Sequence, residues 1–293
     1  HREGLPRGLR RTQPRFLTSG DKTHILKTSL KGVTSVVLTI DVGNTNTVLG
    51  GFEGEELFFV SRIKTDRDRM PDEYAIAFRS IFEINGYGKA SFSGAIISSV
   101  VPPLLPVLRD AVSKLLGCRV LTVSPGTKTG LDIRIDNPAE TGADLVCACV
   151  GALTRYPMPC VVVDLGTATK FLVLDKDGNF LGGPIMPGVN ISLEALARSA
   201  ALLPRIELGR IDHIIGKNSV DCMQAGILYG TAGMVDGVLD RIQEELGQEV
   251  TAVMTGGIAR SIQPFCKRAV AYDENLLLYG LWELYKKNTR PRS

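Results

Sequence analysis

The stretch VLTIDVGNT at residues 37–45 decides the fold of this chain, because it returns at residues 161–169 as VVVDLGTAT. Each copy is a run of apolar, mostly β-branched residues that suits a strand and ends in Asp-x-Gly followed by small polar residues. The aspartates of the two copies are Asp41 and Asp164. This repeat divides the chain and predicts two related halves.

The chemistry of the repeated phrase indicates a grip for phosphate. Gly43 and Gly166 leave no Cβ and tolerate positive φ, so backbone N–H groups can turn towards an anion. A carboxylate beside a phosphate implies a cation, or its water shell, between them. The residues that follow supply side-chain donors: Asn44, Thr45 and Thr47 in the first copy, and Thr167 and Thr169 in the second.

Composition agrees with a cytoplasmic enzyme. The 293 residues are 44% hydrophobic, enough for one large or two medium domains, and contain no apolar run of membrane-spanning length. The six cysteines lack paired Cys-x-x-Cys spacing and lie mostly in apolar sequence, which is typical of reduced thiols. We therefore predict a cytoplasmic location and no membrane partner.

Charge is concentrated at the beginning of the chain. Residues 1–35 carry eight Lys or Arg and two acids, whereas the other residues carry a net charge of −3. A basic leader can be a targeting segment or a nucleic-acid arm, but this one lacks strong apolar periodicity. We expect residues 1–35 to be a disordered leader and predict no nucleic-acid partner.

The elements between and after the two copies alternate between helix and strand. The first half predicts helices at 72–85, from Pro102 through Leu116 and at 138–155, and strands at 94–101 and 118–123. The second half predicts a strand and hairpin within 160–183, helices at 192–201 and 219–246, and a strand at 250–254. The break falls at 156–159, which gives domains at 36–157 and 158–286 and a tail at 287–293. After the last strand, Gly256-Gly257 is either a tight turn or a turn that lines a nucleotide.

Other nucleotide-binding motifs are absent from the sequence. Neither G-x-x-x-x-G-K-[ST] nor a helix-opening G-x-G-x-x-G occurs, and the three histidines offer little material for a triad or metal site. The chemistry must rest on carboxylates and backbone donors, which draws attention to Asp144 in NPAETGADL at 137–145. Asn137 can cap a helix and Pro138 suits its first turn, so Asp144 lies further in, beside small residues that let a ligand approach. A solvent-exposed helical aspartate is the other interpretation.

The motifs, taken in order, resemble the type III pantothenate kinases. They are DVGNTNT at 41–47, NPAETGAD at 137–144, DLGTAT at 164–169, PG at 187–188, GKNS at 216–219 and TGG at 255–257. The resemblance extends from about Val36 to Tyr285. It implies the α/β fold of acetate and sugar kinases, Hsp70 and actin, with two related domains around a central cleft, and a homodimer. It also implies phosphorylation of pantothenate by ATP to 4'-phosphopantothenate, the first step of coenzyme A biosynthesis.

The resemblance also implies roles for particular residues. Asp144 aligns with the catalytic base. Asp164 aligns with a site for a monovalent cation, K⁺ or NH₄⁺, and Asp41 with a residue that helps to place Mg²⁺. The ATP-binding residues would be Asp41, Val42, Gly43, Asn44, Thr45, Asn46, Thr47, Val48 and Thr167, and the pantothenate-binding residues Gly142, Ala143, Asp144, Leu145 and Ser219.

Two positions depart from the family pattern. Leu145 stands where the family commonly has Arg, and Ile135 near a common Tyr, so a donor is missing beside Asp144. Arg134, Lys128 or a residue of a partner subunit are candidates to replace it. The leading hypothesis is an active pantothenate kinase; the alternatives are a non-catalytic or regulatory paralogue that binds nucleotide or a pantothenate-like metabolite, and a kinase of the same fold with another acceptor.

Overall fold

The computed structural model describes residues 35–88 and 91–289. The predicted leader lies outside the described residues except for Ser35, which already begins the first strand. The description below concerns the described residues alone.

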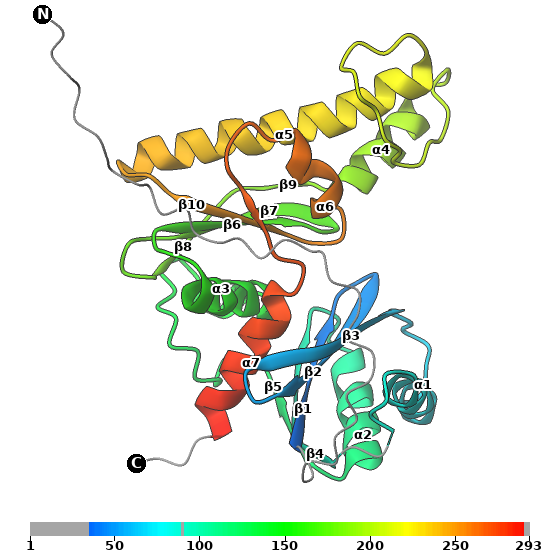
Figure 1. Cartoon of the computed structure of the whole chain (residues 1–293), viewed down its shortest axis with the longest axis vertical. Helices are drawn as coiled ribbons and strands as arrows, with labels where there is room; N and C mark the ends of the chain where they lie inside the picture. The colour runs from blue at the N-terminus through cyan, green and yellow to red at the C-terminus, as the bar shows by residue number, and fades with distance from the viewer. Residues whose placement is uncertain (1–34, 89–90, 290–293) are drawn as a thin grey trace, which may run out of the picture. The chain divides into compact units, whose positions relative to one another are not determined.

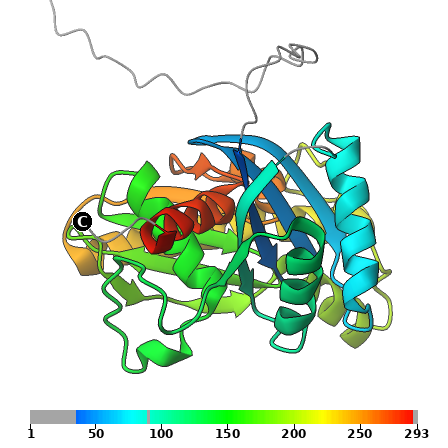
Figure 2. The same ribbon diagram turned by 90° about the horizontal axis from the view of Figure 1, so that it is seen from below.

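The first sheet is formed by the half of the chain that carries the first phrase. Its strands lie in the order β3-β2-β1-β4-β5, with β2 antiparallel to β1 and β3, and β4 and β5 parallel to β1. The strands are β1 (Ser35–Val42), β2 (Asn46–Glu53), β3 (Glu56–Lys64), β4 (Ser91–Ser99) and β5 (Arg119–Thr122). Helices α1 (Pro71–Ile84) and α2 (Leu104–Leu116) pack side by side (Figure 2) and bury Phe78 and Leu108 against Ile40 and Ile97 of the sheet.

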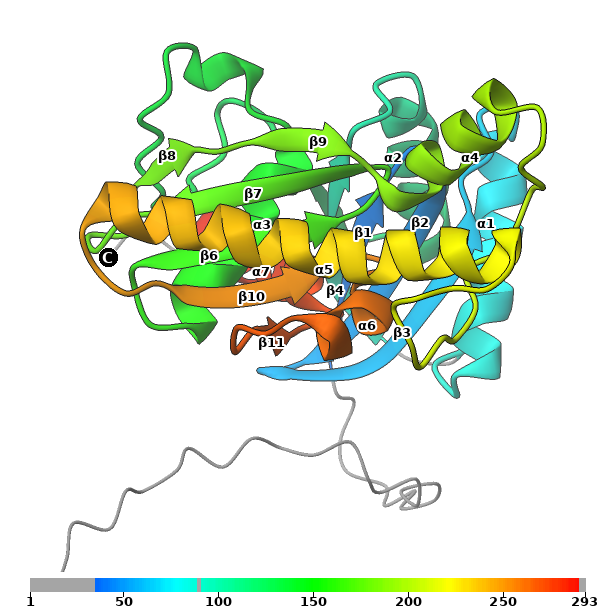
Figure 3. The ribbon, with the colours of Figure 1, turned by 90° about the horizontal axis from the view of Figure 1, so that it is seen from above.

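The second sheet repeats this plan. Its order is β11-β10-β6-β7-β8, with β9 also paired to β7; β7 is antiparallel to β6, while β10 is parallel to β6 and to β11. The strands are β6 (Cys160–Leu165), β7 (Ala168–Leu174), β8 (Phe180–Gly182), β9 (Ile185–Pro187), β10 (Thr251–Thr255) and β11 (Ala271–Tyr272). The long helix α5 (Ser219–Leu246) runs across β6, β7 and β10 (Figure 3) and buries Leu228, Val235 and Leu239 there. The helices α4 (Val189–Ser199), α6 (Ala259–Ile262) and the 3₁₀ turn Gln263–Phe265 complete this part.

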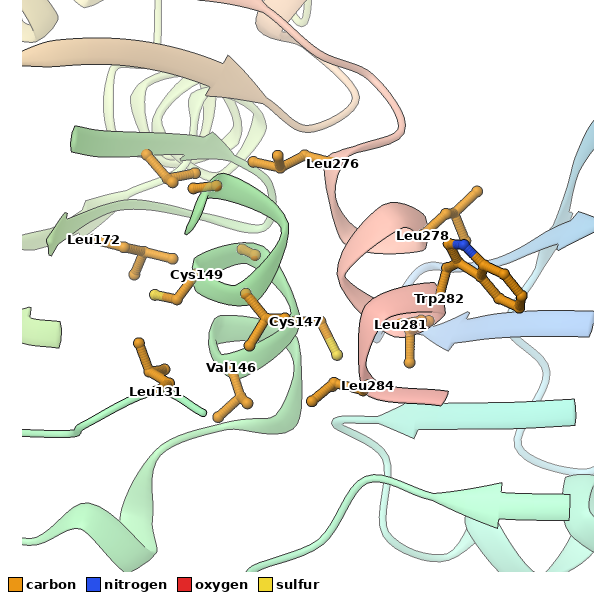
Figure 4. Packing of buried hydrophobic residues seen from close by; sticks show 14 of the residues in the cluster. Leu131, Val146, Cys147, Cys149, Leu172, Leu276, Leu278, Leu281, Trp282 and Leu284 are labelled. Atoms are coloured by element: carbon orange, nitrogen blue, oxygen red, sulfur yellow. The ribbon is translucent and has the colours of Figure 1, made fainter. Parts of the chain in front are cut away.

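Helices α3 (Ala143–Arg155) and α7 (Leu276–Thr289) lie together between the two sheets (Figure 1). Their shared core contains Val146, Cys147 and Cys149 of α3 and Leu281 and Leu284 of α7 (Figure 4). The helices approach closely because Gly280 has no side chain; a Cβ there would collide with the carbonyl of Cys147. The start of α3, which carries Asp144, is thereby fixed between the sheets.

Some predicted element boundaries are wrong, for local reasons. The helix expected from Pro138 is a 3₁₀ turn, Pro138–Glu140, followed by extended backbone at Thr141, and α3 begins only at Ala143. Asn137 makes no capping hydrogen bond to the turn, and its side-chain amide donates to the Glu140 carboxylate at 2.7 Å.

Two other helix bounds also differ. Helix α4 begins at Val189, directly after Gly188, rather than at 192. Helix α7 was not predicted, and it includes residues 287–289, which we had assigned to the tail. Helix α7 also contacts β1 and β4 of the first sheet. The predicted domain boundaries stay a prediction.

Candidate functional site

Hydrogen bonds from side-chain hydroxyl groups stabilise the turn of the first hairpin. The N–H of Gly43 donates to the Asn46 carbonyl at 2.9 Å, and the Thr65 hydroxyl donates to the Gly43 carbonyl at 2.8 Å. The Thr47 hydroxyl lies 3.0 Å from that of Thr65 and is buried, so its side chain supports the turn. The exposed members of the predicted ATP-binding stretch are Asn44, Thr45 and Asn46, whereas Val42 is buried.

The turn of the second hairpin packs closely against two loops that contain glycine. The N–H of Gly166 donates to the Ala168 carbonyl at 3.2 Å, and Thr167 is exposed at the tip. A Cβ at Gly188 would collide with the Thr167 carbonyl, and one at Gly256, where φ is +99°, would lie 2.5 Å from the Leu165 carbonyl. Gly256 therefore packs closely on the second hairpin, and a role of this turn in lining a nucleotide stays a prediction.

The hairpins bring three aspartates and one lysine together. Lys170 Nζ lies 2.7 Å from Asp144 Oδ2 and 2.9 Å from Asp164 Oδ2. Lys170 is directly opposite Asp164 in the β6–β7 ladder, so the two side chains share one face of the sheet. Asp144 reaches them from the first turn of α3, where the helix dipole favours a carboxylate. All three side chains are mostly buried, at 15–19% exposure.

Lys170 is the residue of this site that the sequence analysis missed. A signal was present, because a tight Asp-x-Gly-x-x-x-Lys hairpin pairs its first and last residues. Of the donors suggested to replace the missing arginine, Arg134 is exposed and bound to Asp132 at 2.9 Å. The cation that contacts Asp144 is Lys170.

The pKa of Asp41 in the first hairpin has different determinants from that of Asp164, the equivalent residue of the second hairpin. Burial and the nearby charges of Asp144 and Asp164 raise the pKa of Asp41 from 3.8 to about 7, against smaller opposing effects of the Ser98 hydroxyl and then of the Lys170 ammonium. Burial also raises the pKa of Asp164, but the adjacent Lys170 ammonium opposes that rise more directly. Burial lowers the pKa of Lys170, whereas Asp164 and Asp144 together raise it above its ordinary value, so the lysine is charged at neutral pH.

The chemistry of this group fits Mg²⁺ bound together with a phosphate ligand. Three carboxylates face a single ammonium, which leaves an excess of negative charge. Within residues 35–88 and 91–289, no three carboxylate, histidine or cysteine side chains, these aspartates included, are placed so that they could hold a metal ion by themselves. Mg²⁺ is commonly held by one or two carboxylates, waters and substrate phosphates instead. The described buried hydroxyls without a hydrogen-bond partner are Ser98, Thr141 and Thr169, each close in sequence or strand register to one of the aspartates.

The segment predicted to bind pantothenate surrounds Asp144. Gly142 precedes α3, and a Cβ there would lie 2.6 Å from Asp144 Oδ1, so glycine leaves the carboxylate its place. That oxygen accepts from the Leu145 N–H at 2.9 Å. The side chains of Leu145 and Ile135 each pack against the core between the sheets, so both departures from the family pattern are apolar packing residues.

Ser219 is not part of this cluster. It is the exposed first residue of α5, and Asn218 caps that helix by accepting from the Asp221 N–H at 2.9 Å. No hydrogen bond or ion pair in the described part of the chain joins Ser219 to the aspartates. Its role in substrate binding stays a prediction.

Comparison with solved structures defines the class of protein. A Campylobacter jejuni protein described as a Baf family transcriptional activator superposes with a TM-score of 0.52 at 17% identity, covering 86% of this chain and 98% of its own. Component A of (R)-2-hydroxyglutaryl-CoA dehydratase from Acidaminococcus fermentans does so with a TM-score of 0.52 at 16% identity, covering 87% and 100%. The predicted fold class, an α/β fold with two related sheets, is confirmed.

Comparison of sequences then identifies the family. The model of the type III pantothenate kinase family matches residues 37–241. Type III pantothenate kinase of Moorella thermoacetica is 44% identical over 254 residues, covering 87% of this chain and 100% of its own length. That of Myxococcus xanthus is 45% identical, covering 86% and 99%. The chain belongs to the type III pantothenate kinase family.

Proposed function

We propose that this chain transfers the γ-phosphoryl group of ATP to pantothenate, giving ADP and 4'-phosphopantothenate in the first step of coenzyme A biosynthesis. Family membership over most of the chain supports the reaction. The structural observation that best supports this reaction is the position of Asp144 at the start of α3. Its carboxylate lies 2.7 Å from the Lys170 ammonium and interacts electrostatically with Asp41 and Asp164.

In this proposal Asp144 is the catalytic base. Phosphoryl transfer depends mainly on positioning and charge stabilisation, so a carboxylate that accepts the acceptor hydroxyl's proton is sufficient. The turn of residues 43–46 and Thr167 would hold ATP phosphates, since Asn44, Thr45, Asn46 and Thr167 are exposed and carry polar side chains. Gly142, Ala143 and Leu145 would line the pantothenate side, and Ser219 would contact that substrate.

Asp41 is the residue best suited to help hold Mg²⁺, since its carboxylate makes no ion pair with any described residue, and burial together with neighbouring negative charge raises its pKa. Bound Mg²⁺ supplies charge neutralisation for the phosphate oxygens. The family resemblance also assigns Asp164 a monovalent cation. The residues present do not fit that ion, because the Lys170 ammonium already occupies the contact with the Asp164 carboxylate.

We also propose that the protein is a homodimer and cytoplasmic. Exposed apolar side chains gather on α4 and the segment leading into α5, and this surface favours pairing with a second copy. Its members are Ile191, Leu196, Leu202, Ile214, Ile215 and Val220. All six cysteines are free, as expected in a reducing compartment. No helix of the described residues is long and apolar enough to cross a membrane.

A coupled ADP-release assay tests the proposed reaction. We expect ADP release with Mg-ATP to require pantothenate and to match the amount of phosphopantothenate formed. Nucleotide binding without turnover would instead support the non-catalytic or regulatory alternative. Turnover with other hydroxyl compounds but not with pantothenate would indicate a changed acceptor.

A further inference from the structure

Lys170 occupies an unusual position for a lysine. Its side chain is only 17% exposed, and its ammonium bridges carboxylates from two different elements, Asp144 on α3 and Asp164 on β6. Burying a lysine is costly unless it is paired, and here the ammonium contacts a carboxylate on each of these two elements. The ammonium is therefore a fixed positive charge inside the acidic cluster.

Only the second hairpin has a charged residue opposite its aspartate. Lys170 is opposite Asp164, whereas the residue opposite Asp41 in the first hairpin is Val48. A lysine ammonium is a compact point charge with three donors, the tethered counterpart of a free ammonium ion. It contacts the carboxylate to which the family resemblance assigns a free monovalent cation.

We propose that the Lys170 ammonium is a built-in monovalent cation, which makes nucleotide binding and phosphoryl transfer in this protein independent of K⁺ or NH₄⁺. Lys170 acts as a positioning residue: it holds the Asp144 carboxylate in place and neutralises Asp164. It also provides the only cation in contact with Asp144 among the described residues, next to the apolar Leu145. The part concerning phosphoryl transfer rests on the proposed function; the part concerning nucleotide binding does not.

The first test compares wild-type protein in potassium chloride, ammonium chloride and tetramethylammonium chloride at equal ionic strength. We expect the same rate of pantothenate-dependent ADP release, the same affinity for Mg-ADP by calorimetry and the same melting temperature in all three salts. A rate or an affinity that rises severalfold with K⁺ would overturn the proposal.

The second test removes the ammonium and asks whether a free ion replaces it. Lys170→Ala leaves room for an ion, and we expect its turnover to fall about tenfold or more in tetramethylammonium and to recover in K⁺ or NH₄⁺. Its melting temperature should rise with K⁺, whereas that of the wild type should not. Lys170→Met fills the same space without charge, so it should lose turnover without recovery. Lys176→Ala, in the exposed turn after β7, is the matched control and should behave as wild type.

These outcomes separate this proposal from the proposed function. If the wild type shows no turnover with pantothenate in any salt, the proposed function fails, and the salt dependence of Mg-ADP affinity still decides the role of Lys170. Equal turnover of Lys170→Ala in all salts at the wild-type rate would overturn the built-in cation. If the alanine variant does not fold, the wild-type comparison remains decisive.

Discussion

The two hairpins share a backbone plan but differ in the residue opposite the aspartate. Val48 is opposite Asp41, and Lys170 is opposite Asp164. Burial and the neighbouring carboxylates raise the pKa of Asp41 to about 7, whereas Asp164 is directly paired with an ammonium. In our proposals the two copies therefore have different functions: the first keeps a carboxylate without an ion pair for Mg²⁺, and the second carries its own cation.

The two hairpin turns also differ in the residues that pack against them. The first turn is supported from below by Thr47 and Thr65 and exposes residues 44–46. The second turn is enclosed by Gly188 and Gly256, which lie against its backbone. The open turn is the better surface for a polyphosphate, and the enclosed turn is the better rigid support for Lys170.

Within this comparison the largest expected effect comes from removing the charge of Asp41, and removing the charge of Asp164 is the contrast. Asp41→Asn should lower kcat by about 100-fold or more, because stabilisation of the transition state by Mg²⁺ is worth several kcal/mol. Asp164→Asn should leave the Mg²⁺ dependence of the rate unchanged, since Lys170 keeps its contact with Asp144. Titration of the rate with Mg²⁺ measures both; a stronger Mg²⁺ response to Asp164→Asn than to Asp41→Asn would reverse the assignment.

The pH dependence of stability sharpens the same difference. The pKa of Asp41 is about 7 in the folded protein and 3.8 in the unfolded reference, so the folded state binds more protons between these values. Its contribution to stability is therefore present at low pH and is lost as pH rises from about 4 to about 7. Asp41→Asn lacks this loss.

The advantage of the asparagine variant over wild type should grow by about 2–4 kcal/mol between pH 5 and pH 8, measured by denaturant unfolding in EDTA. Asp177→Asn, in the exposed turn after β7, is the control and should show no such trend. A constant difference across the pH range would mean that Asp41 is ionised throughout.

A smaller effect is expected from making the first hairpin resemble the second. Val48→Lys places an ammonium opposite Asp41 and should weaken Mg-ADP binding about tenfold, because it competes with Mg²⁺ for the carboxylate. Val48→Met is the uncharged control of similar length. Calorimetry of both variants tests this, and equal affinities would show that the opposing residue does not control metal binding.

The sequence predicted the parts of the molecule that depend on local pattern. The two strand–turn phrases, Asp144 and the long helix at 219–246 follow from β-branched runs, small residues and helical periodicity. Helix α7 was missed because it is buried on several faces between two sheets, with Leu276, Leu278, Leu281 and Leu284 all enclosed, so its apolar residues do not form one stripe. The start of α3 was misplaced because the backbone is extended at Thr141, between the 3₁₀ turn and Ala143. Lys170 was missed because its partners come from register and tertiary packing.

The central claim is that the group formed by Asp144, Asp164, Lys170 and Asp41 is a kinase active site with Asp144 as its base. The most direct measurement is the initial rate of phosphopantothenate formation by Asp144→Asn, with Asp177→Asn as control, at saturating Mg-ATP and pantothenate. The account predicts that kcat falls by about 10²–10⁴-fold in Asp144→Asn while the control keeps the wild-type rate. A wild-type rate in a correctly folded Asp144→Asn would contradict it.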